Sequence, residues 1–289
     1  MKELKIYQSI WGMERQHPDG FENSLDANLQ TIRDAGFDGI SVTYEDAAIA
    51  GHAAEFLKAH GMTAQGMCLP TSVDALKPVL ENAAKFGVDH INAQPNIRPR
   101  TFGECVEVLE SWLRLSQEAG IPVYFETHRD RMTNDLFLTL DLVKALPELR
   151  LTADLSHYVV SREFPYPLRD DNQADLRAIL DRSHAFHGRV AGPGQIQLPI
   201  SFPHNKPWVD VFLGWWEYGF RSWLARSQDG STDSDILTFT CELGPRPYAI
   251  VDEKGDDLSD RWQEALLLRA LVRNLWDRVS GVSKDTAAA

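Results

Sequence analysis

Two stretches in the middle of the chain decide its fold: Pro122-Val-Tyr-Phe-Glu-Thr-His128 and Leu149-Arg-Leu-Thr-Ala-Asp-Leu-Ser-His-Tyr158. Each begins with apolar residues, as a strand does, and ends in side chains that can bind a cation. The segment between them, Asn134–Ala145, reads as a helix. Strand, helix and strand within about 35 residues form the βαβ unit of a parallel sheet. Because side chains at the carboxyl ends of such strands face the ligand crevice, these ends are the first candidates for a site.

A repeated pattern extends this unit along the chain. An amphipathic helix ends in glycine and is followed by a short β-rich run at Gly36, Gly61, Gly87 and Gly120. Glycine suits the left-handed position that closes a helix, and an apolar run suits a strand buried on both faces. Four copies of one supersecondary unit indicate a repetitive α/β architecture.

The pattern predicts eight strands, which are Lys5–Trp11, Gly39–Tyr44, Thr63–Cys68, His90–Gln94, Val123–Thr127, Arg150–Asp154, Ala185–Val190 and Leu237–Glu242. It predicts eight helices, at about Ser24–Asp34, Ile49–His60, Val73–Phe86, Thr101–Glu118, Asn134–Ala145, Gln173–Asp181, Val209–Ser227 and Leu258–Arg278. Pro78 implies a late start or a kink in the third helix. We therefore predict a single-domain (β/α)8 TIM barrel over residues 1–282, followed by a flexible tail over residues 283–289. A doubly wound sheet is the alternative, but no G-x-G-x-x-G follows the first strand.

Composition narrows the function classes. The 289 residues are 43% apolar, enough for a large core, and carry 29 basic against 42 acidic side chains, a formal charge of −13. That charge disfavours nucleic acid and anionic membranes as partners. No run of 18 apolar residues and no signal peptide is seen, and the three cysteines are scattered. These features predict reduced thiols and a cytoplasmic location.

One connection is longer than a turn requires. Ala191–Trp208, between the seventh strand and the next helix, is rich in glycine and proline. Loops of this length are usually functional or disordered. Since it follows the carboxyl end of a strand, we interpret it as a lid or substrate-binding loop, with a plain surface excursion as the alternative.

Polar side chains follow the last four strands. Side-chain direction alternates along a strand, so Glu126, Asp154, His187 and Glu242 can converge at the mouth of the barrel. Unpaired buried charge is costly and normally finds a metal or a partner. Three carboxylates and one imidazole suit Mn²⁺ best, with Mg²⁺, Co²⁺ or Zn²⁺ as alternatives.

These residues resemble the xylose isomerase-like TIM barrels, the sugar phosphate isomerase/epimerase superfamily. The matching motifs are Phe-Glu126-Thr-His, Asp154-Leu-Ser-His157, His187 and Thr-Cys-Glu242-Leu-Gly-Pro. The resemblance implies metal ligands at Glu126, Asp154, His187 and Glu242, with His184 as the alternative to His187. It also implies that His157, rather than binding metal, contacts substrate.

The same superfamily contains an apurinic-site endonuclease branch with a three-zinc cluster. The early strands here lack the extra histidines that such a cluster needs, and the charge of −13 also argues against a nuclease. Gln8 and Trp11 instead suit hydrogen bonding and stacking to a polyol, although Trp11 is equally suited to core packing. The remaining candidate substrate-binding residues are His128, Arg189 and Arg246. The two arginines could bind a phosphate or a carboxylate of the substrate.

The resemblance implies an isomerase or epimerase that abstracts a proton next to a carbonyl of a sugar or keto-sugar. A metal-stabilised enediolate would form, with Glu126 and Glu242 as base and acid. The alternative is a lyase or dehydratase that uses the same enolate chemistry. A barrel that binds sugar without turnover is a third reading. The expected partner is a small carbohydrate, and homo-oligomerisation stays open.

Overall fold

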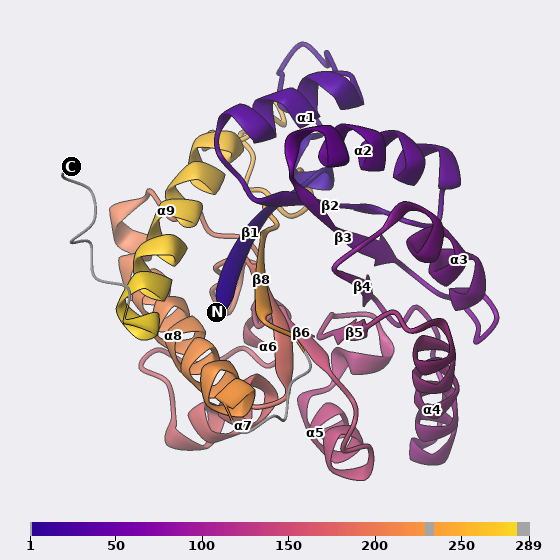
Figure 1. Ribbon diagram of the computed structural model, residues 1–289. Coiled ribbons are helices and arrows are strands. Elements are labelled where there is room, and N and C mark those ends of the chain that lie inside the picture. The colour runs from indigo at the N-terminus through magenta and orange to yellow at the C-terminus, as the bar shows by residue number, and fades with distance from the viewer. Residues whose placement is uncertain (1, 229–233, 282–289) are drawn as a thin grey trace.

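A closed barrel of eight parallel strands, paired in the order β1-β2-β3-β4-β5-β6-β7-β8, forms the centre of the computed structural model (Figure 1). The structure describes residues 2–228 and 234–281, so the predicted tail at 283–289 lies outside the described residues. The strands are β1 (Glu3–Ser9), β2 (Gly39–Thr43), β3 (Thr63–Cys68), β4 (His90–Ala93), β5 (Val123–Glu126), β6 (Leu151–Ala153), β7 (Ser183–Gly188) and β8 (Ile236–Cys241). The predicted barrel is confirmed, and each predicted strand end lies within two residues of the observed one.

Helices surround the barrel. They are α1 (Leu25–Asp34), α2 (Ala47–His60), α3 (Leu76–Phe86), α4 (Phe102–Ala119), α5 (Leu136–Ala145), α6 (Ser156–Ser161), α7 (Asp170–Leu180), α8 (Lys206–Gln228) and α9 (Arg261–Ser280). Three 3-10 turns, η1 (Trp11–Met13), η2 (Met132–Asn134) and η3 (Pro203–Asn205), lie in the loops that follow strands. The short helix α6 was not predicted. Pro78 falls in the first turn of α3, where a missing N–H costs nothing, so the late start is confirmed.

Local sequence explains where several helices begin and end. Thr101 and Glu104 form a capping box at the start of α4, and Asp46 accepts from two backbone N–H groups at the start of α2. Gly61 and Gly120 close α2 and α4 at positive φ, as the repeated glycines predicted. None of the described helices is long and apolar enough to cross a membrane.

The two faces of the strands differ in chemistry. Outward-facing side chains such as Ile40, Phe125 and Phe239 join the apolar core between barrel and helices. Polar side chains fill the inside. There the side-chain oxygen Oε1 of Gln65 accepts from the Thr240 hydroxyl at 2.7 Å, and the side-chain amide of Asn92 donates to Glu126 at 2.6 Å. The barrel interior is thus a hydrogen-bonded network rather than the usual packing of branched apolar residues.

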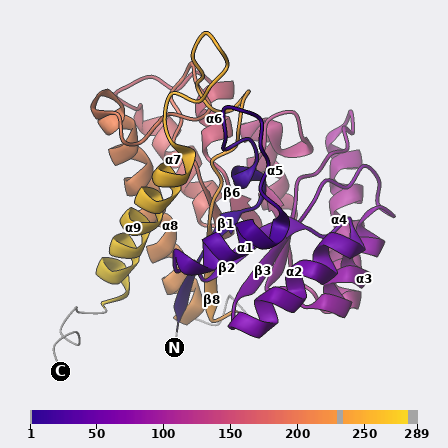
Figure 2. The same cartoon turned by 90° about the horizontal axis from the view of Figure 1, so that it is seen from above.

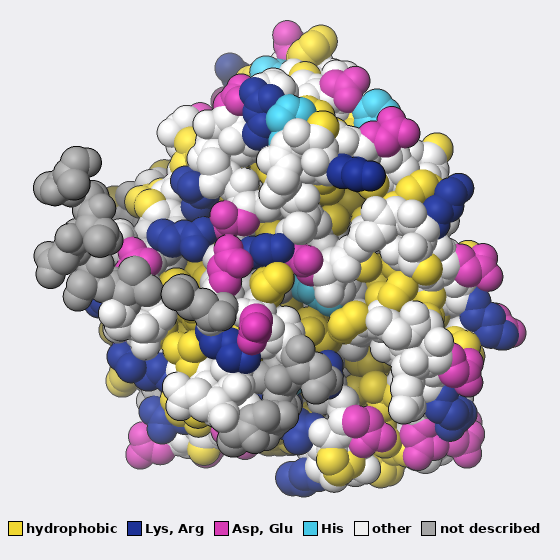
Figure 3. Space-filling model, viewed as in Figure 1, with side chains coloured by type: hydrophobic (Ala, Val, Ile, Leu, Met, Phe, Trp, Pro, Cys, Tyr) yellow, Lys and Arg dark blue, Asp and Glu magenta, His cyan; other side chains and the backbone are white. Residues whose placement is uncertain are grey.

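The amino ends of the parallel strands lie at one side of the barrel and their carboxyl ends at the other. Figure 2 shows the N-terminus of β1 at the lower end of the barrel and α6, which follows β6, at the upper end. On the face seen in Figure 3, acidic and basic side chains are intermixed and form no area of a single sign. A uniform basic surface for a nucleic acid is therefore not seen on that face.

Two glycines of α8 allow a direct test of the packing between helix and barrel. A Cβ at Gly219 would lie 2.5 Å from the Phe186 ring of β7, whereas a Cβ at Gly214 would meet nothing within 4 Å. Gly219→Ala should lower the free energy of unfolding by about 1–3 kcal/mol through overpacking. Gly214→Ala, the matched control, should raise it by about 0.5–1 kcal/mol. Urea denaturation measures both; equal shifts would contradict the packing described here.

Candidate active site

Four strand ends bring together the predicted acidic cluster. Glu126 is the last residue of β5, His187 lies near the end of β7, and Asp154 follows β6 directly. Glu242 follows β8. All four side chains are buried, and one ligand atom from each lies within 4.8 Å of the others. The convergence that the sequence predicted is present, and the structure places His187 rather than His184 in the cluster.

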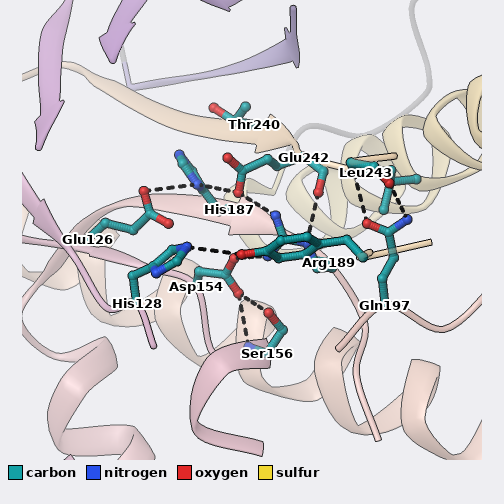
Figure 4. A network of polar contacts seen from close by, with 12 residues as sticks. Glu126, His128, Asp154, Ser156, His187, Arg189, Gln197, Thr240, Glu242 and Leu243 are labelled. Carbon is teal, nitrogen blue, oxygen red and sulfur yellow. Dashed lines mark hydrogen bonds and ion pairs between the residues drawn. The ribbon is translucent and has the colours of Figure 1, made fainter. Parts of the chain in front are cut away.

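Arg189 lies at the centre of the cluster (Figure 4). Its Nη1 is 2.9 Å from Asp154 Oδ2, and its Nη2 is 2.7 Å from Glu242 Oε2. Its Nε donates to the Glu242 carbonyl at 3.0 Å. All three guanidinium nitrogens are thus engaged by protein groups. A residue predicted to contact substrate serves here to pair two carboxylates.

Further contacts orient the four side chains. His187 Nδ1 lies 3.0 Å from Glu242 Oε2 and 3.6 Å from Glu126 Oε2. The Gln65 amide lies 3.0 Å from His187 Nε2, on the other side of the ring. The Ser156 backbone N–H donates to Asp154 Oδ1 at 3.0 Å, and the Ser156 hydroxyl donates to the same oxygen. Each rotamer is therefore fixed before any ligand arrives.

Burial and charge shift the pKa values in different directions. Burial raises the pKa of Asp154; although Arg189 opposes this, the neighbouring carboxylates reinforce it, and the pKa reaches about 6. Burial would also raise the pKa of Glu126, but the charge of His187 outweighs it and holds the pKa at about 2. For His187, burial lowers the pKa, and the attraction of Glu242 and Glu126 overcomes it and raises the pKa well above the usual value.

The donor set fits a divalent cation. Glu126 Oε1 is buried and has no hydrogen-bond partner within residues 2–228 and 234–281. A carboxylate oxygen removed from water without a donor or cation is costly, and oxygen-rich groups with one imidazole suit hard divalent ions. The cluster could therefore hold a metal ion, which would share Asp154 and Glu242 with Arg189.

Two histidines flank the cluster. The rings of His128 and His157 lie 3.8 Å apart, and both histidines form with Glu126 a second group of potential ligands within 4.8 Å. Burial lowers the pKa of each, so both are neutral near pH 7. Nδ1 of His157 is buried without a partner in the described chain. Neutral imidazoles at this place can donate to or accept from substrate oxygens.

A cavity of about 430 Å³ opens onto the cluster through Glu242, Arg189 and His128. Trp11 forms part of its wall, with its ring 5.0 Å from that of Tyr248 and perpendicular to it. The complete lining is Ser9, Ile10, Trp11, Glu14, Ser41, Val42, Thr43, Ile49, Met67, Leu69, Gln94, His128, Arg131, Arg189, Glu242 and Tyr248. The volume is that of a small-molecule site.

Three candidates from the sequence lie elsewhere. Gln8 donates to the Ser9 carbonyl at 3.2 Å and is not among the residues that line this cavity. Arg246 donates to the Gly255 carbonyl at 3.0 Å and lines a separate cavity. His184 lies beside Tyr124, 5.5 Å between ring centroids, and is not part of the cluster.

Sequence reasoning missed Tyr248 and Arg131. Both lie a few residues beyond a strand end, in the loops after β8 and β5. Their place after a strand was a usable signal, because such loops form the active face of a barrel. Loops lack the alternation that tells which side chains point inward, so their direction could not be predicted.

The long connection 191–208 is a packed part of the rim. The Gln197 side chain donates to the Gly244 carbonyl at 3.0 Å and accepts from its N–H at 2.9 Å. The Ile200 N–H donates to Glu264 at 2.6 Å. None of its residues lines the 430 Å³ cavity. Side chains thus tie this segment to the end of β8 and to α9, and its role as a lid or substrate-binding loop stays a prediction.

Comparisons with known proteins support the fold. No family model matches the chain, and no curated protein matches its sequence. Among solved structures, a xylose isomerase-like TIM barrel protein from Mycobacterium smegmatis, in complex with magnesium, has a TM-score of 0.60 at 13% identity and covers 94% of this chain and 97% of its own. A sugar phosphate isomerase/epimerase from Parabacteroides distasonis has a TM-score of 0.58 at 10% identity, over 93% of each chain. The probable 3-DHS dehydratase AsbF from Bacillus anthracis has a TM-score of 0.55 at 13% identity, over 94% of this chain and 99% of its own. These likenesses show that the chain shares the (β/α)8 barrel fold of these proteins, among them the xylose isomerase-like barrels that the sequence motifs resemble.

The central role of Arg189 can be tested by stability. Arg189→Met leaves Asp154 and Glu242 buried without their cation, so the free energy of unfolding should fall by about 3–5 kcal/mol. Arg221→Met removes an exposed arginine paired with Glu217 one helical turn away and should cost at most about 1 kcal/mol. Urea denaturation compares the two. A small, equal effect of both would show that the cluster does not depend on Arg189.

Proposed function

We propose that this chain is a divalent-metal-dependent isomerase or epimerase that acts on a sugar or keto-sugar. The observation that carries the proposal is the cluster itself: carboxylates from β5 and β8 flank a buried acidic site that opens into a cavity of about 430 Å³. The titles of two structural neighbours, a xylose isomerase-like protein and a sugar phosphate isomerase/epimerase, support the reaction class.

The metal would be held by Glu126, Asp154, His187 and Glu242. Mn²⁺ is favoured by three carboxylates and one imidazole, with Mg²⁺, Co²⁺ or Zn²⁺ as alternatives. When bound, a divalent ion polarises a carbonyl and stabilises negative charge on its oxygen. Glu126 Oε1, the carboxylate oxygen without a partner in the described chain, is the position that most needs such an ion.

The protein's own residues would move the protons. Glu126 and Glu242 come from different strand ends and approach His187 Nδ1 at 3.6 and 3.0 Å, and each would exchange a proton with a different face or carbon of the substrate. Exchange on two faces gives epimerisation, and return to the neighbouring carbon gives isomerisation. Glu242 is held by both Arg189 and His187, which fixes its direction. His128 and His157 would bind substrate oxygens, and the Trp11 ring would pack against the carbon skeleton.

A lyase or dehydratase is the second candidate. The specific observation in its favour is the pair His128 and His157 beside Glu126, because a neutral imidazole there could donate a hydrogen bond to a departing hydroxyl. A structural neighbour is described as a probable 3-DHS dehydratase, which also agrees with elimination chemistry. Mass spectrometry of the products separates the two reactions, since isomers keep the mass of the substrate whereas elimination loses water.

The setting of the enzyme is also proposed. The three cysteines are buried and unpaired, which fits a reducing, cytoplasmic location. Residues 1–282 would act as one domain with a small carbohydrate as the partner, without nucleic acid or membrane.

Metal dependence gives a first test. Mn²⁺ added to EDTA-treated protein at about 100 times its dissociation constant should raise the free energy of unfolding by about 2.7 kcal/mol. Glu126→Gln removes one ligand and should weaken Mn²⁺ binding, measured by titration calorimetry, by at least about 10- to 100-fold. Glu110→Gln, an exposed position on α4, serves as the control and should bind as the wild type does. Absence of binding by the wild type would refute the metal site.

Proton exchange gives a second test. Glu126→Gln and Glu242→Gln should each reduce deuterium incorporation from solvent into a ketose substrate by about 100-fold or more. Each variant should keep the circular dichroism spectrum of the wild type, and Glu110→Gln should keep its exchange rate. A screen of ketoses and keto-sugars supplies the substrate, and NMR measures the exchange. Unchanged exchange in both variants would end the assignment of these two carboxylates.

A further inference from the structure

One arginine in the wall of the cavity has few hydrogen-bond partners. Arg131, in the loop after β5, is one of the lining residues, and its side chain is 14% exposed. Nη1 donates to the backbone carbonyl of Asp130 at 2.9 Å and lies 3.4 Å from its carboxylate, while Nη2 makes only a long contact of 3.4 Å with the side-chain oxygen Oε1 of Gln94. Nε is buried and has no partner in the described parts of the chain. Arg189, by contrast, has every nitrogen engaged.

Positive charge gathers around Arg131. Arg129 lies 4.8 Å over the ring of Tyr248, which also lines the cavity. Arg98 pairs with Asp130 at 2.8 Å, and Arg131 reaches the same carboxylate at 3.4 Å. Asp130 is the carboxylate that pairs with Arg98 and Arg131, while Arg129 contacts the Tyr248 ring. A chain with a formal charge of −13 therefore carries a local excess of positive charge at this rim.

The lining of the cavity mixes apolar side chains with the hydroxyl-bearing Ser9, Ser41 and Thr43, which can serve the hydroxyl groups of a sugar. Two arginines also line the cavity, Arg189 and Arg131. Because Arg189 is held by two buried carboxylates, Arg131 is the lining arginine left to meet a negative group on the substrate.

We propose that Arg131 binds a carboxylate of the substrate, so that the substrate is a polyhydroxylated acid rather than a neutral sugar. This inference rests on the proposed function, because it assumes that the reacting end of the substrate lies at the Glu126 and Glu242 cluster. A planar guanidinium matches a carboxylate in a bidentate pair. A phosphate usually collects several donors from a glycine-rich loop or a helix N-terminus, and the loop 129–134 contains no glycine.

The experiment compares acids with their own neutral esters. The probes are D-galacturonate, D-glucuronate and quinate, each against its methyl ester, with D-fructose 6-phosphate against D-fructose as the phosphate pair. Titration calorimetry is done with Mn²⁺ and again with EDTA, which separates binding by a metal from binding by Arg131. At least one acid should bind the wild type about 10- to 100-fold more tightly than its ester.

The variants assign that preference to one side chain. Arg131→Met should bring the ratio of the acid's affinity to the ester's affinity close to one. Arg131→Lys keeps the charge but loses the planar guanidinium, and should give an intermediate ratio. Arg114→Met on α4 removes the same charge from an exposed surface position and should keep the wild-type ratio. Because each ratio is taken within one variant, a general structural defect would weaken acid and ester alike and leave it unchanged.

Several outcomes overturn the proposal. They are a wild type that prefers none of the acids, a preference that survives in Arg131→Met, and a preference for the phosphate alone. No turnover enters this measurement, so its failure is distinguishable from that of the proposed function. A wild type that prefers none of the acids, yet shows the expected deuterium exchange by Glu126 and Glu242, would reject only the role of Arg131. The reverse result would reject only the isomerase chemistry.

Discussion

The buried pairing of Arg189 with Asp154 and Glu242 is the interaction on which the site depends. Three carboxylates within a few ångströms of one another, removed from water, would repel each other strongly. Arg189 places positive charge between two of them and His187 contacts Glu126 and Glu242, which allows the strand ends of β5 to β8 to close around an acidic centre. The barrel thus keeps a reactive group of acids in its interior without sacrificing the packing of its apolar core, which lies outside the strands.

The polar residues inside the barrel hold the side chains of the cluster in position. Polar side chains continue below the cluster, where Gln65 links His187 to Thr240 and Asn92 holds Glu126. Each contact restricts a side chain that would otherwise rotate, and restricted groups need little reorganisation when charge develops on a substrate. The same network explains why strands buried on both faces are not uniformly apolar in this sequence.

Much of the fold, and the four residues of the acidic cluster, could be predicted because strands and helices impose periodicity on the sequence. Glu126, Asp154, His187 and Glu242 terminate or follow strands, so their shared direction followed from the βα repeat. Loops carry no such period, and for that reason the inward direction of Tyr248 and Arg131 was missed. The tethers that hold Ala191–Trp208 through Gln197 and Glu264 could not be predicted, because they join residues far apart in the chain. Such contacts depend on tertiary structure and leave no local pattern.

For the choice of substrate, the position of the charged side chains matters more than the net charge of the chain. A net charge of −13 would repel an acid at long range, but charges beyond about 8 Å are largely screened at physiological salt. Within a cavity partly shielded from water, a guanidinium at contact distance dominates. Arg131 therefore sets the local potential at the rim, while the carboxylates set it at the cluster. A substrate that is anionic at one end and rich in hydroxyl and carbonyl oxygens at the other matches both ends.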